Sequence, residues 1–146
     1  MESLTRIKNA NYIILKDVDS VCRKNNLRYF LDYGTLLGAV RHKDFIPWDD
    51  DIDLVVLRED YERFIEVCKR ELPEKYEVVE YTDHNGLFWD FISRIQIKDS
   101  YLHIPTEVDL KYGNRNNRVC ADIFILDKRD IVIFVPPSKM IHFFII

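Results

Sequence analysis

An acidic run directly before an apolar segment constrains this chain more than any other feature. Four aspartates fall within residues 49–53, and apolar residues follow as far as Leu57. Side chains of a strand alternate between its faces, so Asp51 and Asp53 would share one face while residues 52, 54 and 56 point into a core. Two carboxylates on one face repel each other unless a cation lies between them. The pattern therefore favours a site for Mg²⁺ or Mn²⁺. The alternative is a solvated acidic turn before an ordinary strand.

Residues 29–43 read as a strand, a glycine turn and a short helix. Gly34 allows a tight turn, and Thr35 is a good N-cap for the apolar turns that follow. A helix that begins there presents free N–H groups and the positive end of its dipole to an anion. Gly34 would let a phosphate approach the backbone, and the Thr35 hydroxyl would donate a hydrogen bond. His42 lies beside this phosphate site and is the only histidine that merits a functional test.

The remaining pattern predicts an α/β (α+β) fold. Apolar spacing predicts helices over residues 3–25 and 59–72. Strands are expected at 27–33, 51–57, 76–81, 88–97 and 119–126, with a hairpin across residues 84–86, where Asn-Gly is a strong turn signal. Residues 112–117 read as a polar loop.

Composition agrees with one globular domain. The chain has 146 residues, of which 47% are hydrophobic and 32% charged, and its net charge is −4. Such a charge offers no general attraction for nucleic acid, so a bound anion must be held locally. The N-terminus leads into an amphipathic segment rather than a secretory signal, which predicts a cytoplasmic location. Cys22, Cys68 and Cys120 lie within apolar patterns and are expected to be reduced core thiols.

The segment Tyr29–Asp53, YFLDYGTLLGAVRHKDFIPWDDDID, resembles the LicD family of phosphocholine transferases, which also includes fukutin and the fukutin-related protein. The resemblance continues less tightly through residues 58–64, 92–102 and 120–124, and so extends to about Asp127. It implies a nucleotidyltransferase-like mixed sheet flanked by helices.

The resemblance also implies roles for individual residues. Asp51 and Asp53 match the metal-binding pair of the family, and Asp122 matches a third acidic position at the end of a later strand. Gly34 and Thr35 match the turn that binds the nucleotide phosphates.

Other positions in the same block receive less specific roles. Arg41 matches a basic position that would contact the diphosphate, although capping of the helix C-terminus explains it equally well. Asp49 and Asp50 match the acidic run and would shape the loop or orient the metal pair. The sequence departs from the family at Tyr33 and Asp44, where glycine is frequent. The first change is expected to be mild, and the second requires Asp44 to tolerate a conformation that suits glycine.

The implied function is metal-dependent transfer of a phosphorylated alcohol, such as phosphocholine, from a CDP-linked donor such as CDP-choline to a glycan or related acceptor. Modification of lipopolysaccharide or teichoic acid would be of this kind. Asp51, Asp53 and Asp122 would hold Mg²⁺ or Mn²⁺, and one of the carboxylates would help to deprotonate the acceptor hydroxyl. One alternative is nucleotidyl transfer to a small molecule. Another is a shortened chain that binds nucleotide without turnover.

The C-terminal segment 131–146 is strongly apolar, but it is interrupted by two prolines and is shorter than the roughly 20 residues of a membrane-spanning helix. Family members generally continue well past the third acidic position. We therefore expect residues 1–146 to form a single domain that is C-terminally truncated relative to the family. An exposed apolar end would allow self-association or contact with a membrane surface.

Overall fold

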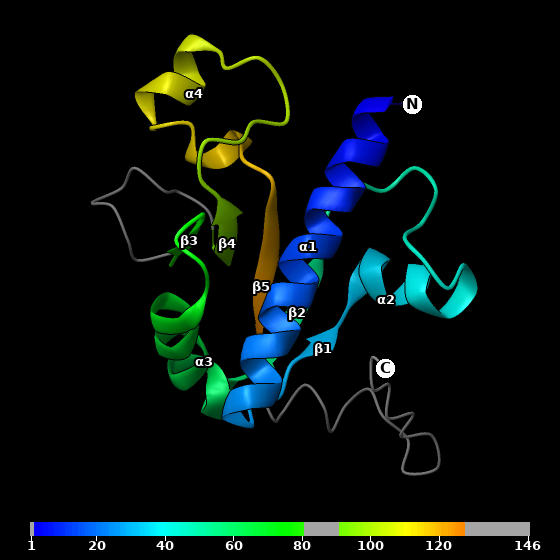
Figure 1. The fold of residues 1–146 in the computed structure, drawn as a ribbon, viewed down its shortest axis with the longest axis vertical. Coiled ribbons are helices and arrows are strands. Elements are labelled where there is room, and N and C mark those ends of the chain that lie inside the picture. The colour runs from blue at the N-terminus through cyan, green and yellow to red at the C-terminus, as the bar shows by residue number, and fades with distance from the viewer. Residues whose placement is uncertain (1, 81–90, 128–146) are drawn as a thin grey trace.

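The computed structural model describes residues 2–80 and 91–127. Within them, a five-stranded mixed sheet has the strand order β1-β2-β5-β4-β3 (Figure 1). The strands are β1 (Phe30–Leu31), β2 (Asp53–Leu57), β3 (Tyr76–Val79), β4 (Ser93–Ile97) and β5 (Cys120–Leu126). The helices are α1 (Glu2–Asn25), α2 (Tyr33–Arg41), α3 (Arg58–Glu71), α4 (Glu107–Lys111) and the 3-10 turn η2 (Arg115–Asn117). The expected α/β (α+β) class, with helices flanking a mixed sheet, is confirmed.

One parallel pair lies at the centre of the sheet. β2 and β5 run parallel, whereas β1·β2, β4·β5 and β3·β4 are antiparallel. β2 and β5 are joined through α3, β3 and β4, since two parallel neighbours need a crossover connection. This crossover brings residues 53 and 122, far apart in the chain, to the same level of the sheet.

Helices α1 and α3 bury one face of the sheet. α1 runs across the front of the strands in Figure 1, and α3 lies beside its lower part. Apolar side chains from both helices and the central strands form one core, which includes Ile14, Val18, Leu54, Val56, Phe64, Ile95 and Ile123. The expected burial of residues 52, 54 and 56 is confirmed, since all three are fully buried. The other face of β2 is also covered, because Asp53, Val55 and Leu57 are buried as well.

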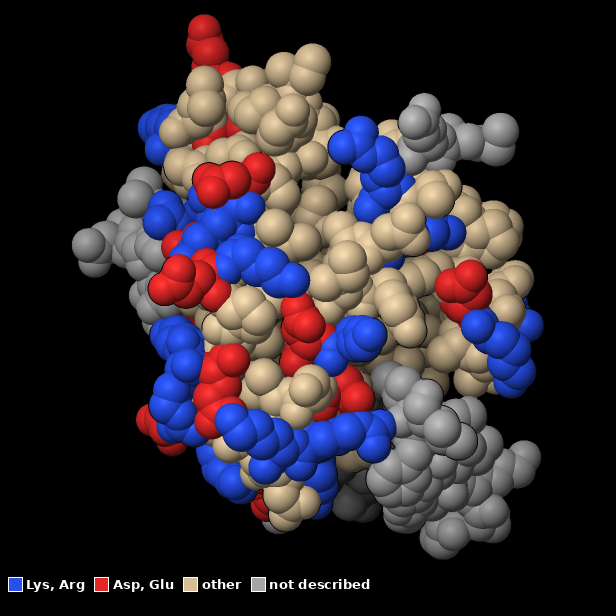
Figure 2. Space-filling model, in the orientation of Figure 1, with Lys and Arg blue, Asp and Glu red and all other residues tan. Residues whose placement is uncertain are grey.

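The surface over this layer carries mixed charge. Figure 2 shows Lys and Arg side chains interspersed with Asp and Glu over the lower part of the same face. Several of them form ion pairs, including Arg23–Asp19, Lys24–Glu71 and Arg28–Asp60. Interspersed charges of both signs give no continuous positive field for a nucleic acid on this face.

Cys22 and Cys68 agree with the expectation of reduced core thiols, whereas Cys120 is less buried. Cys22 and Cys68 are buried free thiols, and burial raises the pKa of Cys22 to about 12. Cys120 is a half-buried free thiol on β5. Among the helices of residues 2–80 and 91–127, none has the length and apolar character to cross a bilayer.

Several expected boundaries were wrong. β1 has two residues rather than seven, because it pairs only with Leu54 and Val55 before the chain turns into α2. α2 begins at Tyr33, so Thr35 lies inside the first turn and Asp32 is the N-cap, with extended dihedrals and no side-chain capping bond. β2 begins at Asp53, because residues before it form a loop. α4 and η2 were not expected. The hairpin at 84–86 and the segment 131–146 lie outside the described residues.

Candidate functional site

The sheet register places two aspartates side by side. Asp53 is the first residue of β2 and is directly opposite Asp122 of β5 in the parallel pair. The Asp122 N–H donates to the Ile52 carbonyl at 2.8 Å, which fixes this register. Opposite residues of adjacent strands project from the same face of a sheet. Two of the three acidic residues expected in the site therefore share one face of the central strands.

The third acidic contribution comes from the loop before β2, residues 44–51, which we call the acidic loop. Carboxylate oxygens of Asp49, Asp50 and Asp51 all lie within 4.8 Å of one another. This trio is the one grouping of potential metal-binding side chains at such spacing within the described residues. It differs from the expected set of Asp51, Asp53 and Asp122, and Asp51 belongs to both.

Electrostatics link the acidic loop to the strand aspartates. Burial first, and then the neighbouring loop aspartates and Asp122, raise the pKa of Asp51 to about 6. Burial first, and then Asp51 and Asp122, raise the pKa of Asp53 to about 6. Asp53 is buried, with 8% of its surface exposed to solvent, whereas Asp51 is exposed. The ionised carboxylates thus repel one another, and a bound divalent cation would relieve this repulsion.

Arg94 supplies a counter-charge that sequence reasoning missed. It lies opposite Asp122 in the β4·β5 pair, and its Nε donates to Asp122 Oδ1 at 2.8 Å. The two side chains are 14% and 18% exposed, so the ion pair is largely shielded from water. The available signal was an arginine within a predicted strand of a segment that resembles the family. Its partner could be found only from the strand register.

Thr35 joins the start of α2 to the strand that carries Asp53. The Asp53 N–H donates to Thr35 Oγ1 at 2.8 Å, and Thr35 is buried. On the other side, the Asp32 N–H donates to the Asp53 carbonyl at 3.1 Å. The expected role of Thr35 as N-cap was wrong, because its hydroxyl serves the backbone of β2 instead of the backbone of its own helix.

The acidic loop packs against two glycines of α2. A Cβ atom at Gly34 would lie 2.4 Å from Asp49 Oδ2, and one at Gly38 would lie 2.7 Å from the Asp44 carbonyl oxygen and 2.8 Å from the Ile46 nitrogen. Residues four apart lie on the same face of a helix, so both glycines form one contact surface for the loop. Gly34 therefore has a packing role here, in addition to the phosphate turn predicted from the sequence.

The two departures from the family pattern affect the backbone differently from the expectation. Tyr33, expected to be a mild change, has φ +41° and begins α2 in the left-handed region. This conformation costs a non-glycine residue on the order of 1 kcal/mol. Packing of its ring on Phe124, with centroids 5.1 Å apart, offsets part of that cost. In the loop, the positive φ falls on Lys43, at +57°, rather than on Asp44.

Arg41 and His42 stand at the opposite end of α2 from Gly34. The helix has nine residues, so its ends are separated by about 12 Å along the axis. Both residues are exposed, and the His42 N–H donates to the Gly38 carbonyl at 2.8 Å. This backbone bond satisfies the Gly38 carbonyl near the helix C-terminus. Contact of either side chain with a diphosphate stays a prediction.

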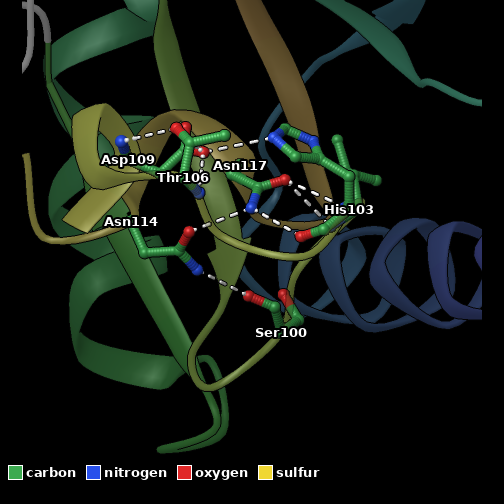
Figure 3. Close-up of polar contacts among 7 residues, drawn as sticks. Ser100, His103, Thr106, Asp109, Asn114 and Asn117 are labelled. Carbon is green, nitrogen blue, oxygen red and sulfur yellow. Dashed lines mark hydrogen bonds and ion pairs between the residues drawn. The ribbon is translucent and has the colours of Figure 1, made fainter.

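A second polar centre lies in the connection between β4 and β5 and has a structural role (Figure 3). Asn117 is fully buried, and its Oδ1 accepts from the N–H groups of Leu102 and His103 at 3.2 and 3.1 Å. Its Nδ2 donates to the His103 carbonyl at 2.9 Å and to Asn114 Oδ1 at 3.0 Å. The His103 ring pairs with Asp109 of α4. This network fixes the loop and gives His103 a structural role.

The mixed sheet agrees with the nucleotidyltransferase-like fold that the resemblance implies. Residues 26–143 match the model of the LicD/FKTN/FKRP nucleotidyltransferase domain. The chain belongs to this LicD family.

Two curated relatives show the range of the family. In an alignment of 137 positions that covers 87% of the chain, it is 36% identical to the lipopolysaccharide cholinephosphotransferase LicD of Haemophilus influenzae. In an alignment of 132 positions that covers 85% of the chain, it is 33% identical to the human ribitol 5-phosphate transferase FKRP. These alignments cover 46% and 23% of the two relatives, so the chain spans less than half the length of each.

Proposed function

We propose that this chain carries the donor-binding and metal-binding part of a transferase that moves a phosphorylated alcohol from a CDP-linked donor to a glycan or related acceptor. The observation that carries the proposal is the side-by-side placement of Asp53 and Asp122, with Asp51 close enough to raise the pKa of Asp53. The two named relatives, which transfer cholinephosphate and ribitol 5-phosphate, support the class of transferred group.

The donor atoms of the acidic site fit a hard divalent cation. The site offers carboxylate oxygens, the ligands that Mg²⁺ and Mn²⁺ prefer, from Asp51, Asp53 and Asp122. These carboxylates repel one another, and a bound cation would neutralise part of their negative charge. These three residues would hold the ion, whose positive charge would offset the negative charge that develops on the leaving nucleotide. Arg94 holds Asp122 in position through its Nε hydrogen bond. The carboxylates also provide a base for the acceptor hydroxyl.

The start of α2 would hold the donor phosphates. Thr35 Oγ1 accepts from the Asp53 N–H and retains its own hydrogen for a phosphate oxygen. The Asp49 carboxylate lies against Gly34, so a phosphate entering here would displace it.

Binding of the donor to the purified chain tests this proposal without an acceptor. We expect CDP-choline or CDP-ribitol to bind in the presence of Mg²⁺ or Mn²⁺, measured by calorimetry, and to bind at least tenfold more weakly to Asp53→Asn and Asp122→Asn. Glu74→Gln, an exposed carboxylate outside the site, is the matched control and should bind like the parent. Equal donor affinity in all four proteins would refute the assignment.

Product analysis addresses the group that is transferred. Transfer of a phosphorylated alcohol releases CMP and leaves the phosphorylated alcohol on the acceptor, whereas nucleotidyl transfer attaches the nucleotide to the acceptor. We expect transfer to a glycan or glycan-precursor acceptor to release CMP from the donor. We expect this transfer to take place on the cytoplasmic side of the cell. Comparison of CDP-choline with CDP-ribitol separates the two transferred groups named by the relatives.

A further inference from the structure

Three hydrogen bonds connect α1 to the acidic loop. Lys8 Nζ donates to the carbonyl oxygens of Ile46 at 2.7 Å and Pro47 at 2.9 Å. Asn11 Nδ2 donates to the Asp50 carbonyl at 2.7 Å. Lys8 and Asn11 are three residues apart, so both lie on the same face of the helix. The loop thus receives three of its backbone contacts from a helix almost forty positions earlier in the chain.

The other side of the loop rests on α2. Gly38 packs closely against the backbone of Asp44 and Ile46, and Gly34 packs closely against the Asp49 carboxylate. The Ile46 carbonyl also accepts from the Asp49 N–H at 3.0 Å, which closes a turn inside the loop. Residues 44–51 have no helix or strand of their own. Their conformation is therefore set by the two helices on either side of them.

Asn11 stands where stability alone would favour an apolar residue. It is 1% exposed and lies on the buried stripe of α1 that includes Ile14 and Val18. Its Oδ1 has no hydrogen-bond partner among the described residues. A buried acceptor without a partner costs folding free energy, so the contribution of this side chain is the single bond that it donates to Asp50.

We propose that Lys8 and Asn11 are positioning residues for the acidic site. They fix the carbonyls of the acidic loop so that the carboxylates of Asp49, Asp50 and Asp51 are already arranged before a divalent cation binds. The Lys8 ammonium also places a positive charge against a loop that carries four negative ones. This inference rests on the proposed metal site. It assigns a functional role to α1, which precedes the matched family domain at residues 26–143.

Asn11→Leu separates positioning from folding. Leucine keeps the branching at Cγ and the number of side-chain heavy atoms, and it removes both the donor to Asp50 and the unpaired Oδ1. Asp50 is exposed, so water can replace the lost donor. We expect the free energy of unfolding in EDTA to stay unchanged or rise, while the dissociation constant for Mn²⁺ alone, measured by calorimetry, rises at least threefold. Asn9→Leu makes the same change at an exposed position of α1 and should leave Mn²⁺ affinity unchanged.

Lys8 gives a second, independent measurement. Lys8→Met should weaken Mn²⁺ binding at least threefold, and Lys8→Arg, which retains donors and charge, should restore most of it. Lys16→Met, at an exposed position of the same helix, is the control. Parent-like Mn²⁺ affinity in both Asn11→Leu and Lys8→Met would overturn the positioning role alone. A parent chain that binds no Mn²⁺ would refute the metal site itself, and the positioning role with it.

Discussion

Replacing Asp53 with asparagine should make the metal-free protein more stable at neutral pH while impairing its proposed function. The pKa of Asp53 rises from 3.8 to about 6 in the folded chain, with burial as the first cause and repulsion by Asp51 and Asp122 next. The unfolded chain therefore loses this proton at lower pH than the folded chain. As a result, the free energy of unfolding falls as the pH rises from 3.8 to about 6 and stays reduced above that pH.

The size of the effect follows from the pKa values. At about 1.4 kcal/mol per pKa unit, an ionised Asp53 costs the metal-free fold on the order of 3 kcal/mol above about pH 6. Asparagine has the same shape and no charge at any pH, and the backbone bond from residue 53 to Thr35 is retained. Asp53→Asn should therefore match the parent near pH 4 and exceed its stability by about 2–3 kcal/mol near pH 7.5.

Urea denaturation in EDTA at both pH values measures this difference directly. Glu74→Gln is the control for loss of an exposed negative charge, and should follow the parent at both pH values. Saturating Mn²⁺ should stabilise the parent and remove most of the advantage of Asp53→Asn, since a ligand stabilises only the fold that binds it. The reasoning is refuted if the variant and the parent differ equally at both pH values, or if the parent is the more stable protein near pH 7.5.

Three further variants test the supports of the site. Thr35→Val leaves the Asp53 N–H without its acceptor and should lower the free energy of unfolding by about 1–3 kcal/mol in urea, whereas Thr35→Ser should lose less than half of that. Gly38→Ala forces a methyl group against the Asp44 carbonyl and should destabilise by about 1–3 kcal/mol and weaken Mn²⁺ binding, both measurable by thermal shift. Lys43→Gly relieves the positive φ and should raise the free energy of unfolding by up to about 1 kcal/mol. This gain should appear as a higher melting temperature. A lowered melting temperature would contradict that assignment.

Sequence periodicity was sufficient for the elements that form the core. α1 and α3 follow from apolar spacing, and β2 follows from the apolar residues 52, 54 and 56, because these patterns lie within short segments of the sequence. The start of α2 was misplaced for a local reason as well. Thr35 is a good N-cap by type, but Asp32 precedes it in extended conformation, and the helix begins between them.

The assembly of the site depended on information that a local pattern lacks. The spacing of Asp51 and Asp53 indicated a metal site, but Asp122 was assigned only through the resemblance, because nothing local to residues 120–124 fixes their register against β2. Arg94 and Lys8 were missed for the same reason, since each acts on a partner 28 to 39 positions away.

Asn11 is different, because its sequence position did carry a signal. It falls four residues after Ile7 and three before Ile14, on the apolar stripe of α1, where an amide must find a hydrogen-bond partner once buried. A polar residue at such a position predicts a specific contact without naming it. The partner proved to be a carbonyl inside the acidic loop. The stripe that packs α1 on the sheet thus also carries the side chain that reaches the acidic run, so that one helix face contributes to both folding and the proposed metal site.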